Sequence, residues 1–298
     1  MLTIIIPYYK IDFFKETLES LEHQTCKKFN LFIGNDASLE NPENLISEIL
    51  KITPFRYKKY TENLGSKNLV KQWERCIEDC TSEEWFMILG DDDVVSENFV
   101  EEFYKNLPQI KINDCHVVKF SQCWIDERGE VIRDFTHYNK LMSPLENWEK
   151  KYIQGHQSSL SEHIFSKTSY LKYGFQHFPL AWGTDDVAVL EFSDRKNIFF
   201  ISEAKVLVRM SSENISSKTD NIKEKETAVH YLEEYLLKKY YKNLPKDYVS
   251  KKLQQHIHYA FKHKPSDLRL NLLKLYWHLK DYRKILTLPK TYFYLYSQ

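Results

Sequence analysis

The first 110 residues alternate short apolar runs with segments of helical periodicity. Apolar runs of strand length lie at 2–7, 29–34 and 85–89, and 55–60 is predicted to form a shorter strand. Before the 85–89 run, over 69–80, apolar side chains recur at the three- and four-residue spacing of one helix face. Strands that alternate with helices are typical of a parallel α/β sheet, so this region is predicted to form a doubly wound half-sheet.

Polar residues and a proline predict where the helices of this region begin. Asp12 is expected to cap the helix after the first strand, and Ser96 the helix that follows the 85–89 strand. Asn41 and Pro42 fit a cap and a first-turn proline for the helix after the second strand. Each predicted helix thus starts shortly after a strand ends.

The pattern changes after Phe120. Residues 123–132 are predicted to form a β-hairpin around a glycine turn. Residues 144–218 mix short helices and strands without regular alternation, and from Asp220 onward the periodicity is helical. The tail is predicted to form three helices, over 221–243, 247–263 and 267–287.

The balance of charge changes at the same place. The chain carries 42 Lys+Arg and 42 Asp+Glu, of which residues 220–298 hold 16 and 8, leaving 26 and 34 upstream. A basic helical tail therefore follows an acidic α/β region. We expect a domain over 1–218, with halves 1–120 and 121–218, and a basic helical region over 219–298.

Composition excludes several classes of protein. A hydrophobic content of 42% and a charged content of 28% are ordinary for globular proteins, and no apolar stretch reaches bilayer-spanning length. The segment 1–7 lacks the basic region and small-residue cleavage site of a signal peptide. The five cysteines are odd in number and form no Cys-x-x-Cys pair, which favours reduced thiols in a cytoplasmic protein.

Three consecutive carboxylates, Asp91 to Asp93, follow the apolar run 85–89 and Gly90. Open α/β sheets bind their ligands at the carboxyl ends of strands, where these acids fall. Adjacent acids repel one another unless a cation lies among them, and carboxylate oxygens prefer Mg²⁺ or Mn²⁺. The alternative is a solvated acidic turn that begins the next helix, since carboxylates are favoured at helix N-termini.

Four motifs in order resemble those of a known family. They are Ile-Ile-Ile-Pro-Tyr-Tyr-Lys at 4–10, Ile-Gly-Asn-Asp-Ala-Ser at 33–38, Asn-Leu-Gly at 63–65 and Gly-Asp-Asp-Asp at 90–93. Together they resemble the family 2 glycosyltransferases of GT-A fold, the inverting group that builds bacterial surface polysaccharides. The resemblance covers 1–216 and leaves the basic tail outside. It implies an α/β, GT-A-like, mostly parallel sheet with a helical C-terminal extension, a nucleotide-binding half over 1–120 and an acceptor-binding half over 121–218.

The resemblance implies a nucleotide site at the ends of the first strands. Tyr9 matches the aromatic residue that stacks on the base, and Pro7 the backbone contact beside it. Asp36 matches the carboxylate that accepts the imide N–H of the base, a contact that favours uracil, although without the other motifs a helix cap or Asx-turn would be the better explanation. Asn35 departs from the family, which commonly has Asp there, and Asp91 matches the residue near the ribose.

The same resemblance implies a metal site. Asp92 matches the ligand of the cation that grips the diphosphate, with Asp93 as support. Gly90 stands where many relatives carry the first Asp of an Asp-x-Asp motif, so Mn²⁺ or Mg²⁺ is expected to have fewer protein ligands here. Arg209, before a serine-rich loop, is a candidate phosphate clamp.

A second acidic pair is the candidate general base. Breaking a sugar–diphosphate bond requires charge stabilisation on the leaving group, and the attacking hydroxyl must lose a proton. One base and in-line displacement invert the anomeric centre, whereas a retaining glycosidase needs two flanking carboxylates. The family's base is an acid at a helix start in the second half, often in a Glu-Asp pair, which makes Asp185 the first choice and Asp186 the second. The alternative is that both only cap the 186–194 helix.

The leading hypothesis is a hexosyl- or N-acetylhexosaminyltransferase that uses a nucleotide sugar, most simply a UDP-sugar, with a glycan or lipid-linked glycan acceptor. The rival is a non-catalytic relative that binds nucleotide sugar or glycan, which Gly90 and Asn35 leave open. A nucleotidyltransferase is more distant, because it needs a basic triphosphate loop that the sequence lacks.

The basic tail over 219–298 leaves two interpretations open. It packs on the catalytic domain or on a second copy as a homodimer, or it contacts the anionic inner face of a membrane, where a lipid-linked acceptor would lie. The acidic catalytic half argues against a nucleic-acid partner.

Overall fold

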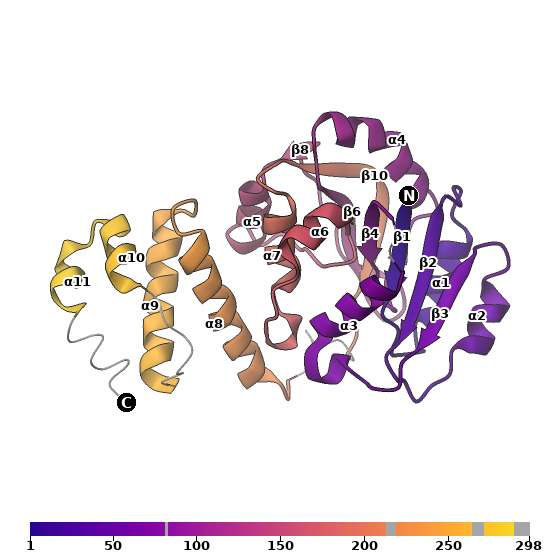
Figure 1. The fold of residues 1–298 in the computed structure, drawn as a ribbon, viewed down its shortest axis with the longest axis horizontal. Helices are drawn as coiled ribbons and strands as arrows, with labels where there is room; N and C mark the ends of the chain where they lie inside the picture. The colour runs from indigo at the N-terminus through magenta and orange to yellow at the C-terminus, as the bar shows by residue number, and fades with distance from the viewer. Residues whose placement is uncertain (81–82, 213–218, 264–270, 289–298) are drawn as a thin grey trace. The chain divides into compact units, whose positions relative to one another are not determined.

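A computed structural model describes residues 1–80, 83–212, 219–263 and 271–288, and its central feature is one mixed sheet (Figure 1). Within these residues the sheet has ten strands, and eight follow one another in the order β3 (Phe55–Lys59), β2 (Phe29–Asn35), β1 (Leu2–Ile6), β4 (Trp85–Ile88), β9 (His163–Ser166), β6 (Val117–Ile125), β10 (Ile198–Arg209) and β5 (Val94–Val95). The remaining two are edge additions, β7 (Val131–Arg133) beside β6 and β8 (Leu141–Met142) beside β10.

The strands β3, β2, β1 and β4 form the parallel half of the sheet. Every residue of β1 and β4 is buried, because helices cover both faces, and this explains their continuous rather than alternating apolar pattern. The connecting helices are α1 (Phe14–Glu22), α2 (Glu43–Ile49) and α3 (Gly65–Cys80), and α4 (Phe99–Ile112) follows β5. Parallel strands end at a common edge, so the residues that follow β1, β2 and β4 gather there.

The second half of the sheet is mixed. Strand β9 runs antiparallel to both β4 and β6, while β10 runs parallel to β6 with a register shift between Ile201 and Lys205. The hairpin predicted at 123–132 is confirmed, since β6 and β7 pair antiparallel and Gly129 adopts a φ of +82° in the connecting turn. The helices of this half are α5 (Pro144–Tyr152), α6 (Lys167–Tyr173) and α7 (Thr184–Phe192). Pairing of β5 with β10 brings the end of β10 next to the acids that follow β4.

Two predicted helix starts differ from the structure. Helix α4 begins at Phe99 rather than after Ser96, and its N-cap Asn98 makes no side-chain capping bond. The Ser96 hydroxyl donates instead to the Asn98 side chain at 2.8 Å and accepts the Lys205 N–H at 2.9 Å, so it joins the helix start to β10. Asp12 does not cap α1 either, because that helix begins at Phe14.

The chain divides into two compact units, one of residues 1–177 and 184–219, the other of 178–183 and the described residues from Asp220 onward. The second unit contains η1 (Pro179–Ala181), α8 (Ile222–Lys239), α9 (Lys246–His263), α10 (Leu272–Leu279) and α11 (Tyr282–Leu286). The single helix predicted over 267–287 is wrong: Lys280 takes a left-handed φ of 60° that ends α10, and Asp281 caps α11. Residues 267–270 of that prediction lie outside the described residues. Over the ranges described, none of the helices has the length and apolar character of a transmembrane span.

Candidate active site

The Asp91 carboxylate joins the carboxyl ends of β1 and β4. Its Oδ2 accepts the backbone N–H groups of Tyr9 at 2.7 Å and Lys10 at 2.8 Å. The Thr17 hydroxyl donates to the Asp91 carbonyl at 3.1 Å, which also fixes the start of α1 against this turn. Asp91 therefore holds the loop that presents Pro7 and Tyr9, a contact that the predicted ribose role does not include.

Asp92 is the least satisfied of the three acids. Among the described residues no side chain donates a hydrogen bond to the half-buried Asp92 carboxylate. The backbone N–H of Asp92 itself donates to it. Burial, and then the charges of Asp93 and Asp91, raises the pKa of Asp92 to about 8. A crowded carboxylate of this kind is stabilised by any cation that reaches it.

Asp93 is buried and fully engaged. Its carboxylate accepts the Ser161 hydroxyl and the backbone N–H of Arg209 at 2.9 Å, and burial raises the pKa of Asp93 to about 6. A Cβ at Gly90 would lie 2.8 Å from Asp93 Oδ2 and 3.1 Å from Asp92 Oδ1. Glycine thus stands at position 90 because the carboxylates of Asp92 and Asp93 fold back over it.

The Arg209 guanidinium is buried and contacts other groups of the protein. It donates to the carbonyls of Asp92 at 3.1 Å and Asp126 at 3.0 Å, pairs with Glu16, and lies 4.4 Å from the centre of the Phe13 ring. These contacts fix the end of β10 against the acidic turn. They give Arg209 an internal structural role, and its part as a phosphate clamp stays a prediction.

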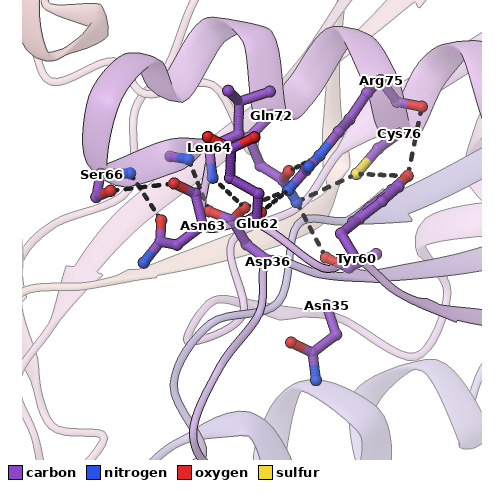
Figure 2. A network of polar contacts seen from close by, with 12 residues as sticks. Asn35, Asp36, Tyr60, Glu62, Asn63, Leu64, Ser66, Gln72, Arg75 and Cys76 are labelled. Atoms are coloured by element: carbon purple, nitrogen blue, oxygen red, sulfur yellow. Dashed lines mark hydrogen bonds and ion pairs between the residues drawn. The ribbon is translucent and has the colours of Figure 1, made fainter.

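Asp36, at the end of β2, lies at the N-terminus of α3 (Figure 2). Its Oδ1 accepts the Leu64 N–H at 2.7 Å and pairs with Arg75, and its Oδ2 accepts the Gly65 N–H at 2.8 Å. Burial raises the pKa of Asp36, and these donors act against that rise. The carboxylate therefore anchors the helix start, as the Asx-turn interpretation requires, whether or not it also contacts a base.

Arg75 orders this corner of the site. Its guanidinium lies 3.8 Å from the centre of the Tyr60 ring and also donates to the Glu62 carbonyl at 3.0 Å. Asn35 lies apart from this network in Figure 2, and its side chain bonds to the Tyr57 hydroxyl at 2.8 Å and the Ser38 N–H at 2.8 Å. Asn35, which departs from the family pattern, thus supports the loop after β2.

The nucleotide-binding candidates after β1 differ in exposure. Tyr9 is 44% exposed, whereas the preceding Tyr8 is fully buried and packs against Phe14. Pro7, which directly follows β1 in the sequence, is half-buried. Tyr9 is thus the aromatic ring of this loop that is open to a ligand.

The second acidic pair lies at the start of α7, where the two carboxylates have different partners. Lys151 from α5 contacts both oxygens of Asp186 at 2.6 and 2.7 Å, and the Tyr152 hydroxyl donates to Asp186 at 2.6 Å. Asp185 lies 3.7 Å from the same ammonium, and no side chain in the described residues donates a hydrogen bond to it. Burial and the charge of Asp186 raise the pKa of Asp185 to about 6, against the influence of Lys151.

A buried ion pair lies between the strands of this half. Glu162, fully buried, accepts the Ser159 N–H at 2.8 Å and the Gln122 amide at 3.1 Å, and lies 3.6 Å from the Lys119 ammonium. Burial alone would raise the pKa of Glu162, but His163, Lys119 and the serine donors together hold it below its ordinary value. Lys119 in turn donates to Asn147 at 2.8 Å.

The charge of Glu162 acts on both acidic clusters. Its charge contributes to the raised pKa of Asp93 and of Asp185, so both clusters lie within its electrostatic reach. Sequence analysis missed Glu162, Lys119 and Lys151. For Lys119 a signal was present, because a lysine inside the apolar run 117–120 has to be paired when that strand is buried.

In the described part of the chain, no three His, Cys, Asp or Glu side chains come together as a ready set of metal ligands. The acids after β4 offer Asp92, with Asp93 already bonded to Ser161 and Arg209. A cation held here would complete its coordination with waters and substrate oxygens, as Mg²⁺ commonly does.

Comparisons with known proteins agree on the fold. A family model described as glycosyl transferase family 2 matches residues 3–168. The S. aureus TarS fragment 1–349 in complex with UDP-GlcNAc has a TM-score of 0.62 at 15% identity, over 99% of this chain and 81% of that one. GalNAc-T7 with UDP, GalNAc and Mn²⁺ has a TM-score of 0.55 at 11% identity, over 96% of this chain and 57% of that one. The curated proteins searched by sequence give no match.

These structural likenesses confirm the GT-A-like α/β fold expected from the sequence. The matched segment 3–168 contains the acids after β4 and the loops after β1 and β2, and it covers more than half of the chain. The chain belongs to glycosyl transferase family 2.

Proposed function

We propose that the chain is an inverting, metal-dependent glycosyltransferase that moves a hexosyl or N-acetylhexosaminyl group from a UDP-sugar to a glycan or lipid-linked glycan. The observation that carries the proposal is the half-buried Asp92 carboxylate, which has no side-chain donor among the described residues and lies beside two further acids at the sheet edge. Family membership supports nucleotide-sugar transfer, and the TarS structure that this chain resembles holds UDP-GlcNAc.

The residues after β4 fit a divalent cation. Burial and the charges of Asp93 and Asp91 raise the pKa of Asp92, so a cation would compete well for this carboxylate. Asp92 would hold Mn²⁺ or Mg²⁺ and Asp93 would support it. Bound there, the cation would stabilise negative charge on the leaving diphosphate.

The acceptor would be activated by Asp185 at the start of α7. Asp186 has both carboxylate oxygens engaged by Lys151 and Tyr152, whereas Asp185 keeps its oxygens available. A raised pKa of about 6 suits a base that takes a proton near neutral pH. One base and displacement from the opposite face invert the anomeric centre.

The nucleotide would lie over the loops after β1 and β2. The exposed Tyr9 ring offers a stacking surface for the base. Asp36 accepts three donors in the structure, and a carboxylate has about four acceptor positions, so one position remains for a base imide N–H. This arrangement favours uracil.

The role of Asp92 is tested by calorimetry of UDP binding with and without Mn²⁺. We expect tight binding only with the metal, and a large loss in Asp92→Asn. Asp247→Asn, an exposed acid on α9, is the matched control and should bind as the parent does. Equal UDP affinity after chelation, or in Asp92→Asn, would refute metal binding through Asp92.

A non-catalytic relative that binds nucleotide sugar or glycan remains the second candidate. It is favoured by Gly90, which contributes no ligand, and by the lack of a three-residue ligand set among the described residues. Binding without turnover would distinguish it from the enzyme.

We further propose that 1–120 serves the donor and 121–218 the acceptor, with the protein in the cytoplasm. An acceptor linked to lipid would place it at the inner face of the membrane.

A further inference from the structure

Four large apolar side chains form an exposed strip on α10 and α11. Leu273 and Trp277 are four residues apart on α10 and are 50% and 65% exposed. Tyr282 and Leu286 have the same spacing on α11 and are 54% and 84% exposed. The rings of Trp277 and Tyr282 lie 5.6 Å apart, so the strip continues from one helix to the next.

The interior of the second unit does not account for this strip. Helix α10 buries a different set of side chains, namely Leu272, Leu275 and Tyr276. The helix is therefore apolar on the face that packs and again on the face that does not. Contiguous exposed apolar surface of this kind marks a site of interaction.

Cations border the strip. Lys274, Lys280, Arg283 and Lys284 are exposed, and the single acid between 271 and 288 is Asp281. The Asp281 carboxylate accepts the Lys284 N–H at 3.3 Å as the cap of α11, so it serves the helix start. The border of the strip is thus strongly positive.

An open hollow of about 590 Å³ lies next to the strip. Leu273 and Trp277 belong both to its wall and to the strip, and Lys242, Lys274 and Asn271 place two ammonium groups and an amide around it. Ammonium and amide groups are donors that suit a phosphate oxygen. The hollow can therefore receive an anionic headgroup beside an inserted Trp277.

We propose that this strip is the surface by which the protein docks on an anionic lipid membrane. Leucine and aromatic side chains enter the boundary between headgroups and acyl chains, while the bordering Lys and Arg bind lipid phosphates. Charge complementarity selects this occupant, because a second copy of the chain would bring the same cations against themselves. The strip lies outside the donor site, so its test does not depend on glycosyl transfer.

The test is flotation of the full chain with vesicles of phosphatidylcholine, alone or with phosphatidylglycerol. We expect binding to the anionic vesicles only, weakening as salt is raised. Trp277→Ser should lower the partition coefficient about tenfold, and Arg283→Gln and Lys284→Gln about fivefold each. Leu286→Ser is the variant least able to disturb folding, since this side chain is 84% exposed.

The matched controls lie in the first unit. Leu39→Ser, at a fully exposed leucine, and Lys51→Gln, at an exposed lysine, should leave vesicle binding unchanged. The proposal is overturned if the parent protein does not bind anionic vesicles, or if it binds neutral vesicles equally strongly. It is also overturned if Leu286→Ser and Trp277→Ser both bind anionic vesicles as the parent does. It is also overturned if light scattering shows a dimer that Trp277→Ser converts to monomer, because a second copy then covers the strip.

Discussion

Lys151 contacts both carboxylate oxygens of Asp186, at 2.6 and 2.7 Å, and lies 3.7 Å from the carboxylate of Asp185. One lysine on α5 thus gives two adjacent acids different states. Asp186 is engaged and fixed, and Asp185 is left with a raised pKa and available oxygens. This asymmetry supports the proposal that Asp185 is the base.

We predict that Asp185→Asn lowers turnover by on the order of 10²–10⁴-fold and leaves UDP affinity intact, because the amide keeps the shape of the side chain but takes no proton. Asp186→Asn should lower turnover less than Asp185→Asn does. It should destabilise the fold more, because it weakens the contacts with Lys151 and Tyr152. Donor turnover and UDP affinity of both variants, measured side by side, decide the assignment. An inactive Asp186→Asn beside an active Asp185→Asn would make Asp186 the base.

The pH dependence of turnover follows from the pKa of about 6 at Asp185. A general base works deprotonated, so turnover should be full well above pH 6 and fall about tenfold per unit as the pH drops below it. Lys151 lowers the pKa of Asp185, so Lys151→Gln should move this acid limb to higher pH. Lys172→Gln, which removes a surface pair with Asp194, is the control and should leave the limb in place. An unmoved limb in Lys151→Gln would show that another group takes the proton.

Gly90→Ala should destabilise the protein by about 1–3 kcal/mol, the usual cost of overpacking. Its Cβ would lie 2.8 Å from an Asp93 oxygen that Ser161 and Arg209 hold in place. Denaturant unfolding measures the loss, and in a Ser161→Ala background the loss should shrink, since Asp93 can then move aside. Equal losses in both backgrounds would show that the collision is not with the held carboxylate.

Selectivity for uracil is the fourth prediction. If Asp36 accepts the imide N–H of the base, UDP should compete for the site far better than CDP or ADP, because a base without that donor leaves the remaining acceptor position of the carboxylate unfilled. Asp36→Asn should reduce this preference and also lower stability by about 1 kcal/mol, because it weakens the anchor at the start of α3. If CDP or ADP competes as well as UDP does, Asp36 does not read the base as proposed.

Much of the fold could be predicted because its central parallel strands are buried on both faces. Strands β1 and β4 contain only buried residues, so β4 appears in the sequence as an unbroken apolar run that leads to the carboxylates, and β1 as an apolar run interrupted only by Thr3. The periodicity of 69–80 likewise predicted most of α3, which spans 65–80 with a kink at Asn68. Such elements can be predicted because the burial of each residue is reflected in whether it is apolar or polar.

Features that depend on distant partners could not be predicted. Ser96 looked like a cap, but its hydroxyl bonds across to β10, 109 residues away. The contact of Lys151 with Asp186 spans 35 residues and follows no motif. Helix α10 ends because Lys280 adopts a left-handed φ. Since Lys280 is not a glycine, nothing in the local sequence predicts this conformation.

Release of UDP from a panel of UDP-sugars, with Mn²⁺ and an acceptor glycan, tests the central claim most directly. We predict release from at least one donor, lost on chelation and in Asp92→Asn and strongly reduced in Asp185→Asn. UDP that binds tightly while no donor is turned over with any acceptor would contradict the claim, and would identify the chain as a non-catalytic member of the family.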